Sequence, residues 1–364
     1  MGRLERYVLF RTFAGVGAAL AVISAVILLV QFVDLSRSVG VRADVGVGDL
    51  FIMTLYKSPG LILLLLPFVF LGGGMSAYIG MNRSSELVAM RAAGVSAWRF
   101  IGPSAAAAFL IGVLTVTVFN PLAADLSARF EAKRASLMDT YLGDTPKEVW
   151  LRQGDEKNLM VIHAKARDNL RGQVRLKGVS VYIYQKDDKG LPRFRRRLEA
   201  ANAELIPGFW RLSSVREASA GENSVRSASL LIRSTLDAES AMERFSSPDS
   251  IAFWKLSNAI RQTELAGFSA AGYRLRLEQL LATPLLFAAM AILAAAFSLR
   301  LDRLGGLAGL AGAGAAFGFV FFFFNQFSGA LASADIIPLA FAAWAPPTIA
   351  LLSGLTLLCY TEDG

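Results

Sequence analysis

The sequence predicts an α-helical membrane protein in which six transmembrane helices, arranged three plus three, flank an inserted all-β domain. Three observations support this fold class. The chain of 364 residues is 54% hydrophobic and only 18% charged, a balance that soluble proteins rarely have. Its apolar residues are gathered into six long runs. The segment between the third and fourth runs instead carries short alternating patterns.

Each apolar run is long enough to cross ~30 Å of hydrocarbon as a helix, which takes about 20 residues. The runs lie near residues 12–33, 59–81, 100–119, 279–299, 305–332 and 338–359, and none contains Lys, Arg, Asp or Glu. The first run is longer than the apolar region of a signal peptide, and no small-x-small cleavage site follows it. Because ion-coupled transporters usually keep ionisable residues within the membrane, we expect any energy for transport to enter from outside the spans.

Basic residues in the short loops predict the orientation. Arginines precede the first run and occupy the loops after the second and fourth runs, whereas the loop after the fifth run has Asp335 and no basic residue. We therefore expect both termini and the loop after the second run to be cytoplasmic. The segment 120–278 then lies on the opposite side, since long domains cross the membrane largely regardless of charge.

That long segment is typical of an antiparallel β-domain. In GVSVYIYQ, Gly178–Gln185, apolar and polar residues alternate with the period of a half-buried strand. EVWLR, NLMVIHA, FWRLSSV and VRSASLLIR are further strand candidates, separated by turn formers. Short strands at this spacing favour a sandwich or jelly roll. Helices are expected over 122–138 and 250–265. The predicted domains are 1–138 with spans one to three, 139–249 with the β-jelly-roll, and 250–364 with a connecting helix and spans four to six.

The stretch RSSELVAMRAAGVS, at residues 83–96, is a short charged segment between two apolar runs. Serines can cap its start, Glu86 lies in the first turn where the helix dipole favours a carboxylate, and Gly94 can end it. One face would carry Leu87, Met90 and Arg91. A helix over 83–95 is therefore either a surface cover for the ends of two spans or a docking helix that transmits motion from a cytoplasmic partner.

These features resemble the LptF/LptG family, the membrane subunits of the lipopolysaccharide export ABC transporter, and the resemblance covers the full chain. It rests on the three-plus-three arrangement, the W-x(3)-G…N-x(2)-V-I run at 150–162, GVSVYIY, WRLSSV at 210–215, and GYRLRLEQLLATPL before the fourth span. QFVDLSR after the first span and FGFVFFFFNQFSGAL in the fifth are more similar to the LptG-type subunit.

The resemblance implies that an LptB-type ATPase dimer binds the 83–95 helix from the cytoplasm. The chain contains no G-x(4)-G-K-[ST] phosphate loop, so we expect it to bind no cofactor, with ATP and Mg used by the partner ATPase. Glu86 is expected to be the anionic contact to the ATPase, and Leu87 and Met90 the buried anchors. The full set of expected coupling residues is Arg83, Glu86, Leu87, Met90, Arg91 and Gly94.

The implied cargo is lipopolysaccharide, whose phosphates need cationic partners and whose acyl chains need an apolar cavity. The candidate residues are Gln31, Asp34, Arg37, Arg129, Lys133, Arg134, Phe317, Phe321, Phe324 and Gln326. Gln31 stands where a relative has lysine, and Arg37 lies close enough to compensate. A solvated helix face is an equal alternative for the cluster at 129–134. Glycines at i, i+4 spacing, Gly305-x(3)-Gly309 and Gly314-x(3)-Gly318, predict close helix packing.

The other implied partners are a homologous LptF-type permease and LptC-type and LptA-type periplasmic jelly-roll proteins, with this chain in the bacterial inner membrane. Neither catalysis nor a metal site is indicated, because His163 and Cys359 are the sole residues of their kinds. The scattered basic residues carry no nucleic-acid recognition motif. Three alternatives remain open: the LptF-type sister subunit, a membrane-anchored periplasmic scaffold for which the Glu86 helix is dispensable, and an enzyme acting on envelope lipids.

Overall fold

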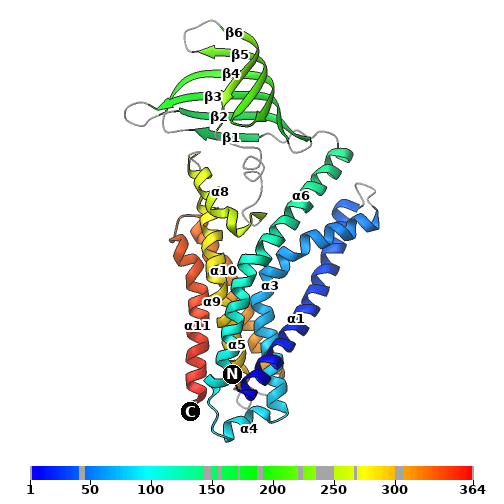
Figure 1. Ribbon diagram of the computed structural model, residues 1–364, viewed down its shortest axis with the longest axis vertical. Helices are drawn as coiled ribbons and strands as arrows, with labels where there is room; N and C mark the ends of the chain where they lie inside the picture. Colours follow the sequence, from blue (N-terminus) through cyan, green and yellow to red (C-terminus); the bar gives the residue numbers. More distant parts are fainter. Residues whose placement is uncertain are drawn as a thin grey trace. The chain divides into compact units, whose positions relative to one another are not determined.

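The computed structural model describes residues 2–40, 46–142, 149–154, 158–170, 173–186, 192–219, 224–234, 250–265, 269–299 and 307–362. The chain divides into two compact units (Figure 1). The membrane unit comprises Met1–Glu131, Ala252–Trp254 and Arg274–Gly364, and the β unit comprises Ala132–Ile251 and Lys255–Tyr273.

Six helices in the described part of the chain are long and apolar enough to cross a membrane, as predicted. The first three spans are α1 (Arg3–Leu35) with the π-turn η1 (Ser36–Gly40), α3 (Val47–Arg83), and α5 (Ala97–Leu114) continued by the π-turn η2 (Thr115–Phe119) and α6 (Asn120–Leu142). The last three are α9 (Ala271–Leu299), α10 (Leu307–Ser333) and α11 (Leu339–Glu362). The interval 34–58 lies between the first two predicted runs, and its described residues are largely helical because α3 begins at Val47.

Helix α9 is the most enclosed span and α1 the most exposed one. In the most apolar stretch of each helix, 67% of the residues of α9 are buried, against 6% for α1. Small side chains at 294–296 of α9 are fully buried and let the neighbouring helices approach closely. Around them Phe70, Phe287 and Leu293 form an apolar core that joins α3 to α9.

Glycines allow α3 to pack tightly against its neighbours. A Cβ added at Gly73 would lie 2.5 Å from the Cα of Val16 in α1, so the two backbones are almost in contact. The close packing predicted for the second glycine pair is present at Gly314, where an added Cβ would collide with Met75 of α3. Of the first predicted pair, Gly305 lies outside the described residues.

Substituting Gly73 with alanine should destabilise the membrane unit. We expect Gly73→Ala to lower the free energy of unfolding by about 1–3 kcal/mol, because overpacking forces backbones apart. At the adjacent Gly72 an added Cβ meets nothing within 4 Å, so Gly72→Ala is the matched control. Thermal unfolding of both variants in detergent measures the difference. Equal midpoints would contradict the tight α1–α3 contact.

The π-turn η2 interrupts the third span and receives the returning chain. A π-turn leaves backbone groups outside the regular helical ladder. The Trp254 indole Nε1 donates to the Thr117 carbonyl at 3.0 Å, and the Phe253 amide donates to Asn120 Oδ1 at 2.9 Å. The chain leaving the third span and the chain returning toward the fourth are therefore joined by two hydrogen bonds. Phe253 and Trp254 are the first two residues of helix α8 (Phe253–Leu265).

The β unit contains one six-stranded antiparallel sheet with the strands in sequential order. They are β1 (Val149–Gly154), β2 (Asn158–Leu170), β3 (Gln173–Lys186), β4 (Pro192–Ile206), β5 (Phe209–Ser219) and β6 (Val225–Arg233). The predicted inserted antiparallel domain is confirmed. The described strands form a single up-and-down sheet, in contrast to the two packed sheets of a sandwich.

One face of this sheet forms the core of the β unit around the fully buried Trp210. The in-out alternation shifts by one residue in three strands, and in β4 the shift lies between the buried Ala200 and Ala203. Leu176 and Val179 of β3 are both buried, although they are three residues apart, because Gly178 between them has φ +62°. Ser214, with φ +57°, produces the same shift in β5. A left-handed residue turns the chain so that the next side chain faces the core again.

Candidate functional site

The helix α4 (Glu86–Ala92) lies at the end of the membrane unit that also holds both chain termini (Figure 1). It is shorter than the predicted 83–95 helix, because Ser85 has left-handed φ +58° and separates it from α3. Gly94, at φ +78°, ends it as predicted. The Val95 amide donates to the Met90 carbonyl and the Gly94 amide to the Arg91 carbonyl, which is the Schellman pattern of helix termination.

One face of α4 packs into the membrane unit and the other is exposed. Leu87 is only 1% exposed, and Met90 packs beside it in a cluster with Val8, Tyr78 and Phe100. The prediction that Leu87 anchors α4 to a partner is therefore corrected: its side chain is enclosed within this chain. On the outer face Val88 is 58% exposed.

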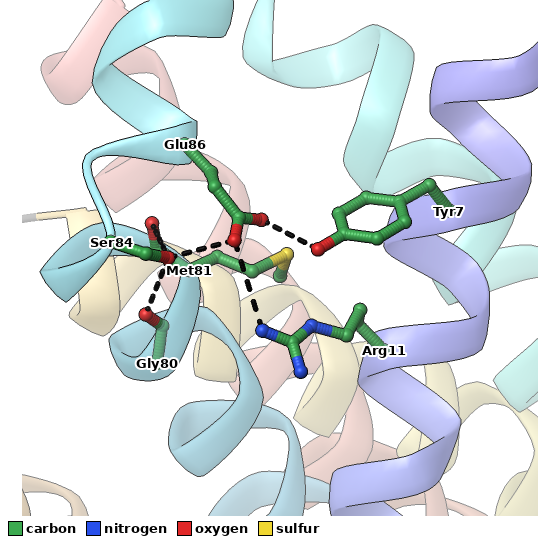
Figure 2. A network of polar contacts seen from close by, with 6 residues as sticks. All are labelled: Tyr7, Arg11, Gly80, Met81, Ser84 and Glu86. Atoms are coloured by element: carbon green, nitrogen blue, oxygen red, sulfur yellow. Dashed lines mark hydrogen bonds and ion pairs between the residues drawn. The ribbon is translucent and has the colours of Figure 1, made fainter.

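Glu86 connects α4 to the first turns of α1 (Figure 2). Tyr7 donates its hydroxyl to Glu86 Oε2 at 2.9 Å, and Ser84 donates to Oε1 at 2.8 Å. Arg11 Nη2 lies 3.8 Å from Oε1. Sequence reasoning missed Tyr7 and Arg11 as partners of this carboxylate. No local signal could have found them, since Tyr7 and Glu86 are 79 residues apart.

These contacts lower the pKa of Glu86 below its usual value. The Ser84 hydrogen bond is the largest cause, followed by that of Tyr7, with a smaller contribution from the charge of Arg11. A carboxyl whose pKa is depressed on folding stabilises the fold above its unfolded pKa and loses that effect as the pH falls through its folded pKa. Glu86 is therefore ionised at neutral pH, and the network keeps its charge under mildly acidic conditions.

Arg91 connects the other end of α4 to the last span. Its Nη2 donates to the Thr361 carbonyl in the final turn of α11 at 3.0 Å, where helix carbonyls are unpaired and a cation is favourable. Arg83, the last residue of α3, is exposed. Among the predicted coupling residues, Leu87 and Met90 thus face into the membrane unit, whereas Arg83 is exposed.

An apolar groove of about 930 Å³ runs between α3 and α10. Ser76 and Arg83 have the only polar side chains among its lining residues, and Arg83 is the last of these along α3, next to α4. The aromatic wall consists of Phe68, Phe319, Phe322 and Phe323.

The phenylalanine face predicted to hold the cargo differs from the face that lines the groove. Phe321 is buried in the core of the membrane unit, and Phe317 packs edge-on against Phe297 of α9. Phe324 is partly exposed but does not line the groove. Helical spacing placed these three residues on one face, but the groove is lined by Phe319, Phe322 and Phe323 instead. Phe321 also packs edge-on against Phe68 of α3, beneath the groove wall.

Ionic side chains gather at the end of the membrane unit opposite α4. Lys57 Nζ of α3 lies 3.3 Å from Asp34 Oδ2 of α1 and 5.8 Å from the ring centre of Phe130. Lys57 was missed by sequence reasoning. The side-chain amide oxygen of Gln31, Oε1, is buried without a hydrogen-bond partner. Arg37 is exposed in η1.

Along α6, Arg129 Nε donates to Asp125 Oδ2 at 2.8 Å. Lys133 follows Arg129 at i, i+4 spacing and is partly exposed, and Arg134 is exposed. Gln326 of α10 is also exposed. Within the described residues no group of three metal-ligating side chains occurs. His163 stacks on Trp150 of the neighbouring strand, with ring centres 4.3 Å apart.

The sequence matches the family model for the lipopolysaccharide export system permease LptF/LptG over residues 6–360. The chain belongs to the LptF/LptG family. This family consists of export permeases rather than catalytic enzymes, and the match confirms the resemblance noted in the sequence.

Two curated LptF/LptG-family proteins are similar over almost their whole length. The lipopolysaccharide export system permease protein LptG of Escherichia coli strain K12 is 24% identical over 373 residues, which cover 98% of each chain. The protein of the same name from Escherichia coli O6:H1 strain CFT073 has the same identity and coverage. The chain is thus a multi-pass membrane protein of a lipopolysaccharide export permease family.

Proposed function

We propose that this chain is the LptG-type permease subunit of an ATP-driven exporter, which extracts lipopolysaccharide from the bacterial inner membrane and passes it to a periplasmic bridge. The observation that carries the proposal is α4. It is a short helix closed by a Schellman motif, packed on its inner face through Leu87, and it presents the apolar Val88 outward. Such an element suits the docking of a partner that supplies mechanical work.

In this proposal α4 and both termini are cytoplasmic, and an LptB-type ATPase dimer binds the exposed face of α4. The chain lacks a phosphate loop, so ATP and Mg bind to that partner and this chain holds no cofactor. The exposed Arg83 flanks the docking face. Leu87 and Met90 hold α4 in place from within the chain.

The cargo is proposed to contact two parts of the membrane unit, an apolar groove and a group of cations. The groove of about 930 Å³ between α3 and α10 offers an apolar wall to acyl chains, and its volume is that of a ligand pocket. Arg37, Lys57 and Arg129 offer cations to phosphates at the opposite end from α4. An LptF-type permease pairs with this chain. LptC-type and LptA-type proteins receive the cargo in the periplasm, where the β unit is proposed to lie.

The test is affinity purification of the full chain from its native membrane in mild detergent, followed by identification of bound proteins and lipids. We expect a P-loop ATPase, a homologous six-span protein and lipopolysaccharide to be recovered together. Recovery of the folded chain with periplasmic proteins but without an ATPase or glycolipid would overturn the transport function and favour an anchored scaffold. Which of the two permeases more closely matches LptF then assigns the subunits.

A further inference from the structure

Helix α4 is attached to both halves of the membrane unit, and the attachment to α1 converges on one carboxylate. Tyr7 and Arg11 are one helical turn apart and reach the two oxygens of Glu86 from the same face of α1. Ser84 braces the carboxylate from the side of α3. The Arg11 guanidinium also lies 5.9 Å from the centre of the Tyr7 ring, so the two α1 side chains support each other.

We propose that Tyr7 and Arg11 are positioning residues that clasp Glu86, so that α1 follows the movement of α4 when the ATPase turns over. This inference rests on the proposed function, since it requires that α4 receive motion from a partner. It assigns Glu86 to an intramolecular role, whereas the sequence predicted a direct contact with the ATPase.

The packing around the clasp supports a rigid connection. Val8, between Tyr7 and Arg11 in the chain, is fully buried in the same apolar cluster as Leu87. Polar and apolar contacts therefore join the same two turns of α1 to α4. Arg99 at the start of α5 also pairs with Glu5 of α1 at 3.2 Å, so α1 is joined to the helix that follows α4 as well.

The two attached helices differ in how far they are buried. Helix α1 is the least enclosed span, whereas α11 packs partly into the bundle. The Arg91–Thr361 contact holds α4 to α11, and the Glu86 clasp holds it to α1, the less enclosed of the two helices. A rotation of α4 about its α11 contact would be transmitted to α1, and thus to the far end where Asp34 meets Lys57.

The experiment compares the full complex of wild type, Tyr7→Phe/Arg11→Gln and Arg6→Gln, each reconstituted with the partner permease and ATPase in vesicles containing lipopolysaccharide. Arg6 is an exposed neighbour on α1 outside the network and serves as the matched control. Three quantities are measured: ATPase binding, ATP hydrolysis, and lipopolysaccharide released per ATP. We expect the double variant to bind the ATPase normally but to release about threefold to tenfold less lipopolysaccharide per ATP, the effect of losing hydrogen bonds of ordinary strength.

A charge exchange provides the second measurement. Glu86→Arg alone should uncouple hydrolysis from release, and Glu86→Arg combined with Arg11→Glu should recover release per ATP. Wild-type coupling in Tyr7→Phe/Arg11→Gln, or no recovery in the exchange, would overturn the clasp and return Glu86 to a direct contact with the ATPase. Failure of the wild-type chain to bind any ATPase would instead overturn the proposed function itself.

Discussion

Replacing Val88 with aspartate is expected to abolish co-purification of the ATPase with this chain. Val88 is 58% exposed on the outer face of α4, while the residue before it, Leu87, is buried. The substitution therefore leaves the packing of α4 intact and places a carboxylate where a partner would cover it. Burying an unpaired charge costs more than about 1.4 kcal/mol, so the affinity should fall by about tenfold or more.

The control for this substitution is Val47→Asp. Val47 is also highly exposed, but it begins α3 at the end of the membrane unit opposite α4. Titration of the purified ATPase onto each variant in detergent micelles gives the two affinities. Wild-type affinity for Val88→Asp would show that the outer face of α4 is not the docking surface.

Filling the groove between α3 and α10 should remove bound lipopolysaccharide without unfolding the chain. Gly72 lines this groove, and a Cβ added to it meets nothing within 4 Å. Gly72→Phe would therefore direct a ring into the space of about 930 Å³ without a backbone collision. We expect the glycolipid that co-purifies with the chain to fall by about tenfold, since an apolar pocket loses binding when its volume is taken.

Gly102→Phe provides the comparison for a new aromatic ring on a span. Gly102 of α5 also has nothing within 4 Å of an added Cβ, and it does not line the groove. Mass spectrometry of lipids bound to the purified variants gives the ratio of glycolipid to protein. Equal ratios in both variants would exclude the groove as the place where the acyl chains bind.

The membrane spans and the end of α4 could be predicted from sequence because each depends on local chemistry. Twenty apolar residues must form a helix in hydrocarbon, and Gly94 can take the positive φ that closes a Schellman motif. The start of α4 could not be placed, since Ser85 adopts a left-handed conformation for which serine carries no strong signal. A continuous helix over 83–95 was the simpler expectation.

The partners of the site residues depended on tertiary packing and were out of reach. Periodicity groups Phe317, Phe321 and Phe324 on one face, but whether that face meets the core or a groove is decided by α9, which buries Phe321 and contacts Phe317 through Phe297. In the same way, the sequence placed Glu86 in the first turn of its helix, but its engagement with α1 follows from how distant helices meet. Lys57 was not singled out because its contacts, with Asp34 and Phe130, come from two other helices.

The hydrogen bonds that Phe253 and Trp254 make with the π-turn region of the third span have an architectural consequence. The segment 121–252, which contains all six described strands, is therefore flanked by residues that are hydrogen-bonded to each other. A short linker between Asn120 and Phe253 could close the bundle in place of this segment, because the two chain passages are already held together. Segment 121–252 is in this sense an exchangeable module, and a pulling force on either of its ends acts on the third span near the same turn.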